Sequence, residues 1–341
     1  MLETLENTGL SIRLGALQGL LPLIESIGED ASKVLAPLGL SVDDFAMPDK
    51  FIPYTSHEAI LENSAALYNV PDFGLRLANA QGLAMLGPVG LMIMHSESVL
   101  EAAFRARNYM SLHVLAEYWT FDVSDELCVI TRFQHQRQQR HQGQPSELSL
   151  GVCYRILRRL VGPDFKLSGL HFTHRRISSD NHYTQYFDAP VNFSQERDQL
   201  FFPKRFLTRE IATFDESITQ QLEVNMDRRL RTQGDKIDRE TQALILASLG
   251  MSQSMLTYIA GLLHMHPRTL QRRLKANGYS FKRLVLETRM NVSRWVLSNS
   301  EMPLTQLSLM LGYNELSAFS KAFKTYHALS PRAWRQRNLN E

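Results

Sequence analysis

The last hundred residues of the chain repeat one pattern twice, and this repeat constrains the fold more than any other feature. In the first copy, a helix from Ser254 to Leu263 is followed by a short turn and a second helix from Arg268 to Ala276. In the second copy, about 45 residues later, Leu304 to Leu311 form a helix and Glu315 to Tyr326 form the next, with a turn at Gly312 between them. Two helices joined by a tight turn are a helix-turn-helix, so we predict two such units in an all-α domain.

The helical phase of the first unit separates an inner face from an outer face. Leu270 and Leu274 are four residues apart and must face the partner helix, so the polar positions around them point outward. Pro267 stands at the first turn and Gly278 follows the last, which are the residues that start and end helices. The outer face therefore carries several arginines and a glutamine.

The second unit has the same organisation with different side chains. Phe319 and Phe323 are predicted to pack inside, and Asn314 to cap the second helix. A helix from Phe281 to about Leu297 joins the two units, and Ser330-Pro331 starts a last short helix.

The duplication indicates DNA binding. A single helix pair of this kind resembles any amphipathic pair, but two units joined by one helix can place two recognition helices in major-groove faces about 34 Å apart. Arg and Gln on such helices bond guanine and adenine edges, so we expect Arg268, Gln271 and Arg272 to read bases. The second unit offers fewer multidentate donors. The complete predicted DNA-contacting set is Arg268, Thr269, Gln271, Arg272, Lys275, Leu316, Ser317, Ser320, Lys321 and Lys324.

The distribution of charge agrees with this prediction. Residues 237–341 contain 14 Lys or Arg and 6 Asp or Glu, a net charge of +8, whereas the rest contains 23 and 29, a net charge of −6. A basic third on an acidic body is typical of a nucleic-acid-binding module. Chance clustering on a solvated face is the alternative.

The preceding part of the chain predicts an α+β domain. Glu117 to Phe133 alternates as a β-hairpin with Ser124-Asp125-Glu126 as its turn. Further strands are expected at 167–174 and at 191–202, the latter with a turn or bulge at Asp198-Gln199. Helices are expected over 12–27, 54–68, 99–115, 146–160 and 215–230, and a polar loop over 134–144.

The expected organisation is the α+β domain at 1–210, a helix and linker at 211–236 and the double helix-turn-helix domain at 237–341. Ile218, Leu222, Met226 and Leu230 form an apolar stripe on the 215–230 helix. This stripe either forms a dimer contact or packs on its own domain, and the sequence alone favours neither.

A set of motifs extends over both helix pairs, and two further motifs lie in the N-terminal part. They are Pro267 to Leu274, Gly278, Phe281, Arg289, Leu311 to Glu315, Ser317 to Lys324, Ser330-Pro331, Trp334-Arg335, and in the N-terminal part Phe73 to Leu77 and Leu86 to Gly90. The C-terminal motifs resemble the AraC/XylS family of transcription regulators over roughly residues 240–337, and the N-terminal part more loosely resembles the regulatory domain of one branch of that family.

The resemblance implies a homodimeric activator of promoters that acts with RNA polymerase and is controlled by a small-molecule effector or a partner. It also implies base contacts at the matching positions of both recognition helices. The chain departs from the family pattern at a few turn and helix positions, so its local turn geometry and base preference are expected to differ from the family's. These positions are His264, His266, Lys321 and Ala328.

Other classes of protein are disfavoured by the sequence. No apolar stretch is long enough to span a membrane, no secretion signal is visible, and Cys128 and Cys153 have no metal-ligand spacing, so a cytoplasmic location is expected. No catalytic residue, cofactor or metal is predicted: His264 with His266, and His171 with His174, lack a third ligand.

Two alternative functions would require other residue patterns. An enzyme acting on DNA would need converging carboxylates, and a non-specific architectural protein would need mainly Lys and Arg.

A small-molecule pocket is expected between the N-terminal sheet and helices. The aromatic side chains that would line it, or that are ordinary core, are Trp119, Phe121, Phe172 and Phe193.

Overall fold

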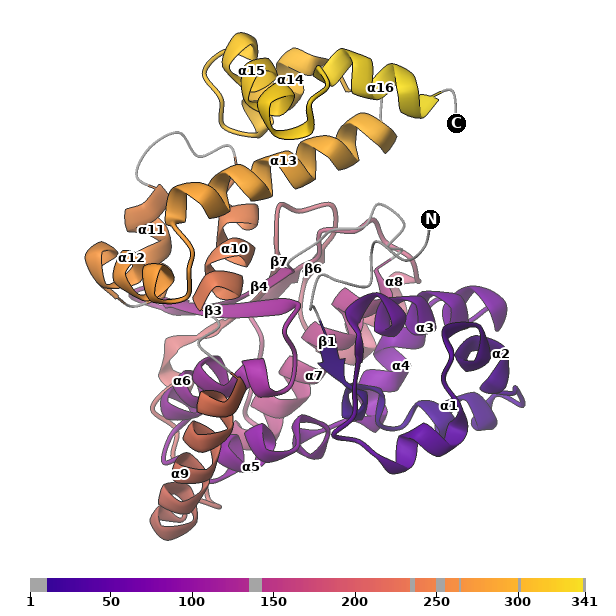
Figure 1. Ribbon diagram of the computed structural model, residues 1–341. Helices are drawn as coiled ribbons and strands as arrows, with labels where there is room; N and C mark the ends of the chain where they lie inside the picture. Colours follow the sequence, from indigo (N-terminus) through magenta and orange to yellow (C-terminus); the bar gives the residue numbers. More distant parts are fainter. Residues whose placement is uncertain are drawn as a thin grey trace. The chain divides into compact units, whose positions relative to one another are not determined.

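The chain forms two compact units, Met1–Gly234 and Asp235–Glu341. The computed structural model describes residues 11–134, 143–233, 237–249, 255–263, 265–299 and 302–339 (Figure 1). The predicted polar loop, apart from its ends, and Ser254 and His264 lie outside the described residues.

A five-stranded sheet organises the first unit, in the order β3-β4-β7-β5-β6. All neighbouring strands are antiparallel except the β5–β6 pair. The predicted hairpin is confirmed, with Thr120 opposite Thr131. A separate two-stranded sheet pairs β1 with β2. The strands are β1 Ser11–Arg13, β2 Phe51–Pro53, β3 Glu117–Val123, β4 Leu127–Gln134, β5 Gly169–His171, β6 Val191–Asn192 and β7 Asp198–Pro203.

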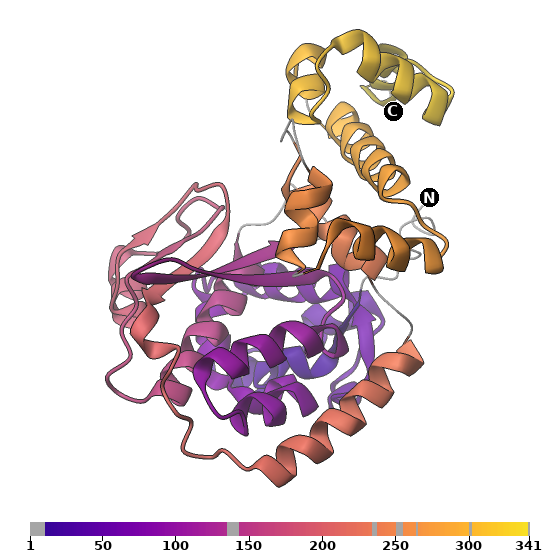
Figure 2. The same ribbon diagram turned by 90° about the vertical axis from the view of Figure 1, so that its left-hand side faces the viewer.

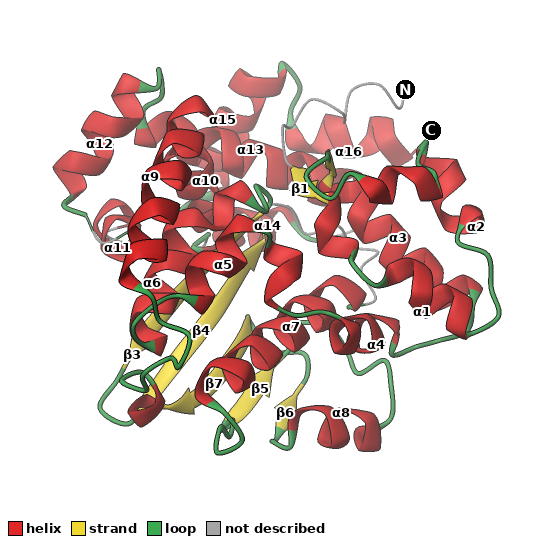
Figure 3. Ribbon diagram, turned by 90° about the horizontal axis from the view of Figure 1, so that it is seen from below, coloured by secondary structure: helices red, strands yellow, loops and turns green. Residues whose placement is uncertain are grey.

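Helices cover one face of this sheet, and Figure 2 shows α5 and α6 below it. The long α7 crosses the same face (Figure 3). The helices of this unit are α1 Leu20–Ser26, α2 Ser32–Leu35, α3 Tyr54–Leu67, α4 Phe73–Ala80, α5 Pro88–Met94, α6 Val99–Tyr109, α7 Gln144–Val161, α8 Asp180–Phe187 and α9 Glu216–Gln233.

Two local expectations were wrong in detail, and one helix was missed. The helix expected over 12–27 begins only at Leu20. Ile12 lies in strand β1 and pairs with Ile52, and a 3-10 turn follows before α1. The strand expected over 191–202 is broken before Asp198, not at it, so β6 and β7 are separate. The short helix α8 was not predicted.

Two glycines in the predicted motifs allow helices to approach closely. A Cβ on Gly74 would lie 2.4 Å from the backbone oxygen of Gln144, where α4 packs on α7. A Cβ on Gly90 would lie 1.9 Å from the backbone oxygen of Leu83. Only glycine fits at these contacts, which explains why the motifs contain it.

The apolar stripe of α9 packs on its own unit. Met226 is 1% exposed and lies in the core with Leu222 beside it, while Ile218 is 39% exposed. Arg105 of α6 forms an ion pair with Glu223, and Tyr109 donates a hydrogen bond to Asp227. Leu222 and Met226 therefore pack on their own unit, whereas Ile218 stays exposed.

The second unit consists of helices only among its described residues. The first pair is α11 with α12, and the second is α14 with α15; α13 runs from one pair to the other (Figure 1). No described helix in either unit is long and apolar enough to cross a membrane. The bounds are α10 Ile237–Ala247, α11 Met255–Leu262, α12 Pro267–Ala276, α13 Phe281–Asn299, α14 Leu304–Met310, α15 Leu316–His327 and α16 Pro331–Leu339.

Candidate nucleic-acid interface

The outer face of α12 has the polar side chains that helical phase predicts. Leu270 and Leu274 are completely buried, and Thr269 is half-buried. No acidic residue lies on this helix. The exposed residues of its outer face are Arg268, Gln271, Arg272 and Lys275.

The start of α12 is capped by a histidine in place of a serine or threonine. The Nδ1 atom of His266 accepts a hydrogen bond from the backbone N–H of Arg268 at 3.2 Å. His266 has extended backbone geometry with φ −68°, as a cap residue requires. Pro267 follows at the first helical turn, where its missing N–H costs nothing. His266 therefore caps α12 as a serine or threonine would.

The second recognition helix, α15, exposes fewer hydrogen-bonding groups. Phe319 and Phe323 are completely buried, while Ser317, Lys321 and Lys324 are exposed. Leu316 was expected outside but packs partly against the core, and Ser320 is half-buried.

The ends of α15 differ from the prediction. Its cap residue is Glu315, not Asn314, and Glu315 accepts a hydrogen bond from the hydroxyl of Ser317 at 2.9 Å. Ala328 ends the helix with φ +60°, a left-handed conformation that glycine adopts at lower cost. This departure from the family pattern is therefore accommodated as backbone strain.

Arg289 of α13 holds the turn of the second helix pair. Its guanidinium lies 4.7 Å from the ring centroid of Tyr313 and donates to the backbone oxygen of Gly312 at 3.1 Å. Arg335 of α16 donates to the backbone oxygen of Met302, 2.6 Å away. Because one arginine bonds the turn between α14 and α15 and the other bonds the backbone just before α14, they position the two helices. The sequence motif contains Arg289 but does not reveal this role.

The first unit contains an apolar cavity of about 150 Å³ between its sheet and helices α5, α6 and α7. Trp119 and Phe121 line it, as expected. Phe172 and Phe193 were expected there but stack on each other elsewhere in the core, with ring centroids 5.8 Å apart.

Several buried polar atoms at this cavity have no hydrogen-bond partner in the described part of the chain. They are both ring nitrogens of His57, Nδ1 of His113 and the hydroxyl of Thr120. Burial lowers the pKa of His57 to about 4 and that of His113 to about 3, so both rings are neutral at pH 7. A neutral imidazole both donates and accepts, so the cavity has unused hydrogen-bonding capacity. No local sequence signal marks these residues, because they come together only in the fold.

The two histidines of the strand predicted at 167–174, His171 and His174, make other contacts. The ring of His171 packs edge-on against Phe201, and Nδ1 of His174 bonds a backbone oxygen. Throughout the described ranges, no group of three or more His, Cys, Asp or Glu side chains is arranged to hold a metal ion.

Comparison with known proteins identifies the family. A family model of the arabinose-binding N-terminal domain of AraC transcription regulators matches residues 28–211, more than half of the chain. This chain belongs to the AraC family of transcription regulators. A second model, of a helix-turn-helix domain, matches residues 259–337 of the regulator and so includes both recognition helices.

The regulator has full-length relatives. It is 27% identical over 330 residues to the HTH-type transcriptional regulator VirS of Mycobacterium tuberculosis, an alignment that covers 96% of this chain and 97% of the relative. It is 21% identical over 338 residues to the ornithine utilization regulator of Pseudomonas aeruginosa, covering 98% and 99%. The crystal structure of the transcriptional regulator CdpR from Pseudomonas aeruginosa aligns with a TM-score of 0.46 and 20% identity, covering 90% of this chain and 96% of that one.

The family models and the curated relatives place the regulator among DNA-binding transcription regulators and not among enzymes.

Proposed function

We propose that this regulator activates specific promoters, reads their bases with the outer faces of α12 and α15, and responds to a small molecule bound in the apolar cavity of its first unit. The observation that carries the DNA-reading part is the exposure of Arg268, Gln271 and Arg272 beside the buried Leu270 and Leu274.

The first recognition helix is proposed to supply most of the discrimination between bases. Arg268 and Arg272 are one helical turn apart and carry forked donors that match guanine O6 and N7, while the Gln271 amide matches adenine. Thr269 and Lys275 flank them and contact the phosphate backbone in this proposal.

The second recognition helix is proposed to discriminate less. Ser317, Ser320 and Leu316 offer single hydroxyls and one half-buried apolar group, and Lys321 and Lys324 are point charges suited to phosphates. Specificity should therefore be stronger in the half of the operator that α12 contacts.

Selection of duplexes from a random library tests this proposal. The affinity of the full chain for the enriched sequence and for random DNA is measured at several salt concentrations. Specific regulators bind their site at least about 10³-fold more tightly than random DNA. A ratio near one would show non-specific binding and contradict base reading.

Effector control is supported by the unused hydrogen-bonding groups of the cavity. A cavity of about 150 Å³ accommodates a molecule about as large as benzene. The proposed effector is therefore a compact, mainly apolar molecule with one or two neutral polar groups for His57, His113 or Thr120. Glu117 is not available to such a molecule, because its carboxylate already accepts from Arg132, Tyr54, Ser149 and Trp119.

A cavity-filling variant tests effector control. Ala106→Leu places a larger side chain in the cavity, and Ala36→Leu makes the same change at an exposed site. A library of small phenols, short-chain alcohols and amides is screened by thermal shift on the full chain. A compound that raises the Tm of the wild type and of A36L, but not of A106L, supports the proposal; equal shifts in all three contradict it.

We also propose an activator role, a homodimeric assembly and a cytoplasmic location for the regulator. A relative that is 29% identical over 77 residues is named the transcriptional activator FapR of Escherichia coli, and it covers 23% of this chain. We propose that the regulator activates by contacting RNA polymerase, in the cytoplasm, where promoter DNA is accessible. Transcription in vitro with purified polymerase should increase when the regulator is added.

A homodimer is proposed through exposed apolar residues at and near α9. Val224 is 72% exposed on that helix, and Phe214 and Ile218 are 42% and 39% exposed. Dimerisation would make the second DNA contact intramolecular and so raise the affinity. A monomeric mass by light scattering at micromolar concentration would contradict it.

A further inference from the structure

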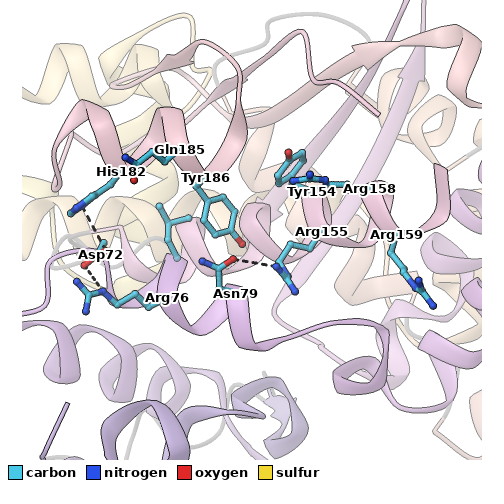
Figure 4. Close-up of a pocket in the computed structure, with 11 residues that line it drawn as sticks. Asp72, Arg76, Asn79, Tyr154, Arg155, Arg158, Arg159, His182, Gln185 and Tyr186 are labelled. Carbon is cyan, nitrogen blue, oxygen red and sulfur yellow. Dashed lines mark hydrogen bonds and ion pairs between the residues drawn. The ribbon is translucent and has the colours of Figure 1, made fainter. Parts of the chain in front are cut away.

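A second hollow in the first unit differs in chemistry from the apolar cavity. It has a volume of about 470 Å³ and lies among α4, α7 and α8 (Figure 4). Its lining is polar and rich in arginine, and none of the DNA-binding residues proposed above belongs to it.

Each of the three helices presents one face to this hollow. Arg76 and Asn79 are three residues apart on α4. On α7 the lining residues Arg155, Arg158 and Arg159 are spaced by three and four, and on α8 His182, Gln185 and Tyr186 have the same spacing. Because residues three and four apart share a helix face, three separate polar faces converge on one space. A solvated face of a single helix would not produce this arrangement.

The hollow carries an excess of positive charge. It has four arginines, and Asp72 is the one carboxylate among its lining residues. Asp72 accepts from Arg76 at 2.9 Å, and Arg155 donates to Asn79 and to the backbone oxygen of Gln81 at 3.2 and 3.1 Å.

The guanidinium groups of Arg158 and Arg159 have no hydrogen bond or ion pair within the described residues. This cationic site lies on a part of the chain, residues 1–236, that has a net charge of −6.

A buried hydroxyl at the same place also lacks a partner. The Oη atom of Tyr186 is inaccessible to solvent and has no hydrogen bond among the described residues. Figure 4 shows the Tyr186 hydroxyl directed toward Asn79 and Arg155 at the floor of the hollow. Burial holds the pKa of Tyr186 well above its usual range, so the hydroxyl is neutral and available as a donor.

We propose that this hollow binds a small anion with two or more acidic groups, such as a phosphorylated or polycarboxylic metabolite. Arg158 and Arg159 supply the charge, and the Tyr186 hydroxyl donates at the floor. Arginine suits this task because its planar fork bonds two oxygens of a phosphate or carboxylate at once.

The anion site is separate from the apolar effector cavity. The cavity is lined by Leu148, Val152 and Ile156 of α7, whereas the hollow is lined by Tyr154, Arg155 and Arg158 of the same helix. The two sites therefore share α7 as a wall but use different faces of it. A failure of one proposal leaves the other unaffected.

The anion site is tested by isothermal titration calorimetry on the full chain with inorganic phosphate, pyrophosphate and citrate at constant ionic strength. Arg158→Gln with Arg159→Gln removes two charges from the hollow. Lys204→Gln with Arg205→Gln removes two charges from exposed positions of the same unit that do not line it. Tyr186→Phe removes only the hydroxyl.

At least one of the three anions should bind saturably to the wild type. R158Q/R159Q should weaken that binding about tenfold or more, and Y186F about threefold, since charge-assisted hydrogen bonds are worth more than neutral ones. K204Q/R205Q should remain within about twofold of the wild type, because exposed distant charges are screened.

Two results would overturn the proposal. One is that R158Q/R159Q leaves anion binding unchanged. The other is that none of the three anions binds saturably; weaker binding of R158Q/R159Q to a random-sequence duplex would then make the hollow a contact for the DNA backbone. Circular dichroism of each variant checks that the fold is retained.

Discussion

Arg132 and Glu117 form a buried ion pair diagonally across strands β4 and β3, with 2.7 Å between Nη2 and Oε1. Their side chains are 1% and 5% exposed, and Asp198 of β7 contacts the same guanidinium at 3.0 Å. Burial raises the pKa of Glu117, but Arg132 and the hydrogen bonds from Arg132 and Tyr54 outweigh it and hold that pKa below its usual range. The pair thus ties three strands together beside the apolar cavity.

Removing one member of this pair should be strongly destabilising. Glu117→Ala leaves a buried arginine short of a partner, so the free energy of unfolding should fall by about 3–5 kcal/mol in urea denaturation. The lowered pKa also means that the pair stabilises the fold above the ordinary carboxyl range and that this stability is lost on acidification. Glu117→Ala combined with Arg132→Leu should lose less than the sum of the two single losses. Strict additivity would show that the pair contributes no coupling.

Glu147 should make stability fall as the pH rises above 7. Burial raises its pKa to about 8, although the Tyr183 hydroxyl bonds it. A raised pKa means that the folded state keeps a proton that the unfolded state releases, so stability is present at low pH and lost as the pH rises through about 8. The free energy of unfolding should fall by about 1–2 kcal/mol between about pH 7 and 9.

The neutral amide of Glu147→Gln should abolish this dependence. Glu126→Gln, at an exposed turn, serves as the matched control and should retain it. Burial lowers the pKa of His57 and of His113, so their effect on stability is complete below pH 7. It does not overlap the range between about pH 7 and 9 in which Glu147 is tested. If E147Q and the wild type show the same slope, the buried carboxyl is not protonated.

Substitutions on α12 should separate base reading from backbone contact. Arg268→Ala and Arg272→Ala should each cost about 1–3 kcal/mol of operator affinity and relax specificity at one base pair. Lys324→Ala on α15 should weaken all sequences alike and lower the salt slope by about one. Arg273→Ala is the control, because Arg273 is exposed on the same helix but lies off the proposed reading face. If R273A reduces specificity while R268A and R272A do not, the proposed reading face of α12 is wrong.

Gly90→Ala should destabilise the first unit. The new Cβ would lie 1.9 Å from the Leu83 backbone oxygen, and backbone cannot move aside cheaply, so a loss of about 2–4 kcal/mol is expected. Gly261→Ala in α11 meets nothing within 4 Å and should instead stabilise by about 0.5–1 kcal/mol. Thermal unfolding of both variants measures the contrast. Equal effects would mean that steric contact does not explain Gly90.

The two helix pairs were predictable from the sequence because their signals are local. The spacing of Leu270 and Leu274, with Pro267 before and Gly278 after, sets the phase and both ends of α12 within a few residues. The β3–β4 hairpin was predictable for the same reason, since alternation and a polar turn occupy adjacent positions. Glu147 was expected near the start of a helix, which is also local information.

The binding sites of the first unit were decided only by the tertiary structure. His57 and Thr120 come from different elements and meet at one cavity, and Tyr183 reaches Glu147 from α8, a helix that was not predicted from the sequence. The same holds for Arg158 and Tyr186 in the arginine-rich hollow. Burial, pKa and pairing of these side chains depend on neighbours distant in sequence. Periodicity and capping report only on neighbours within a few residues, so they reveal helices and strands but not the sites between them.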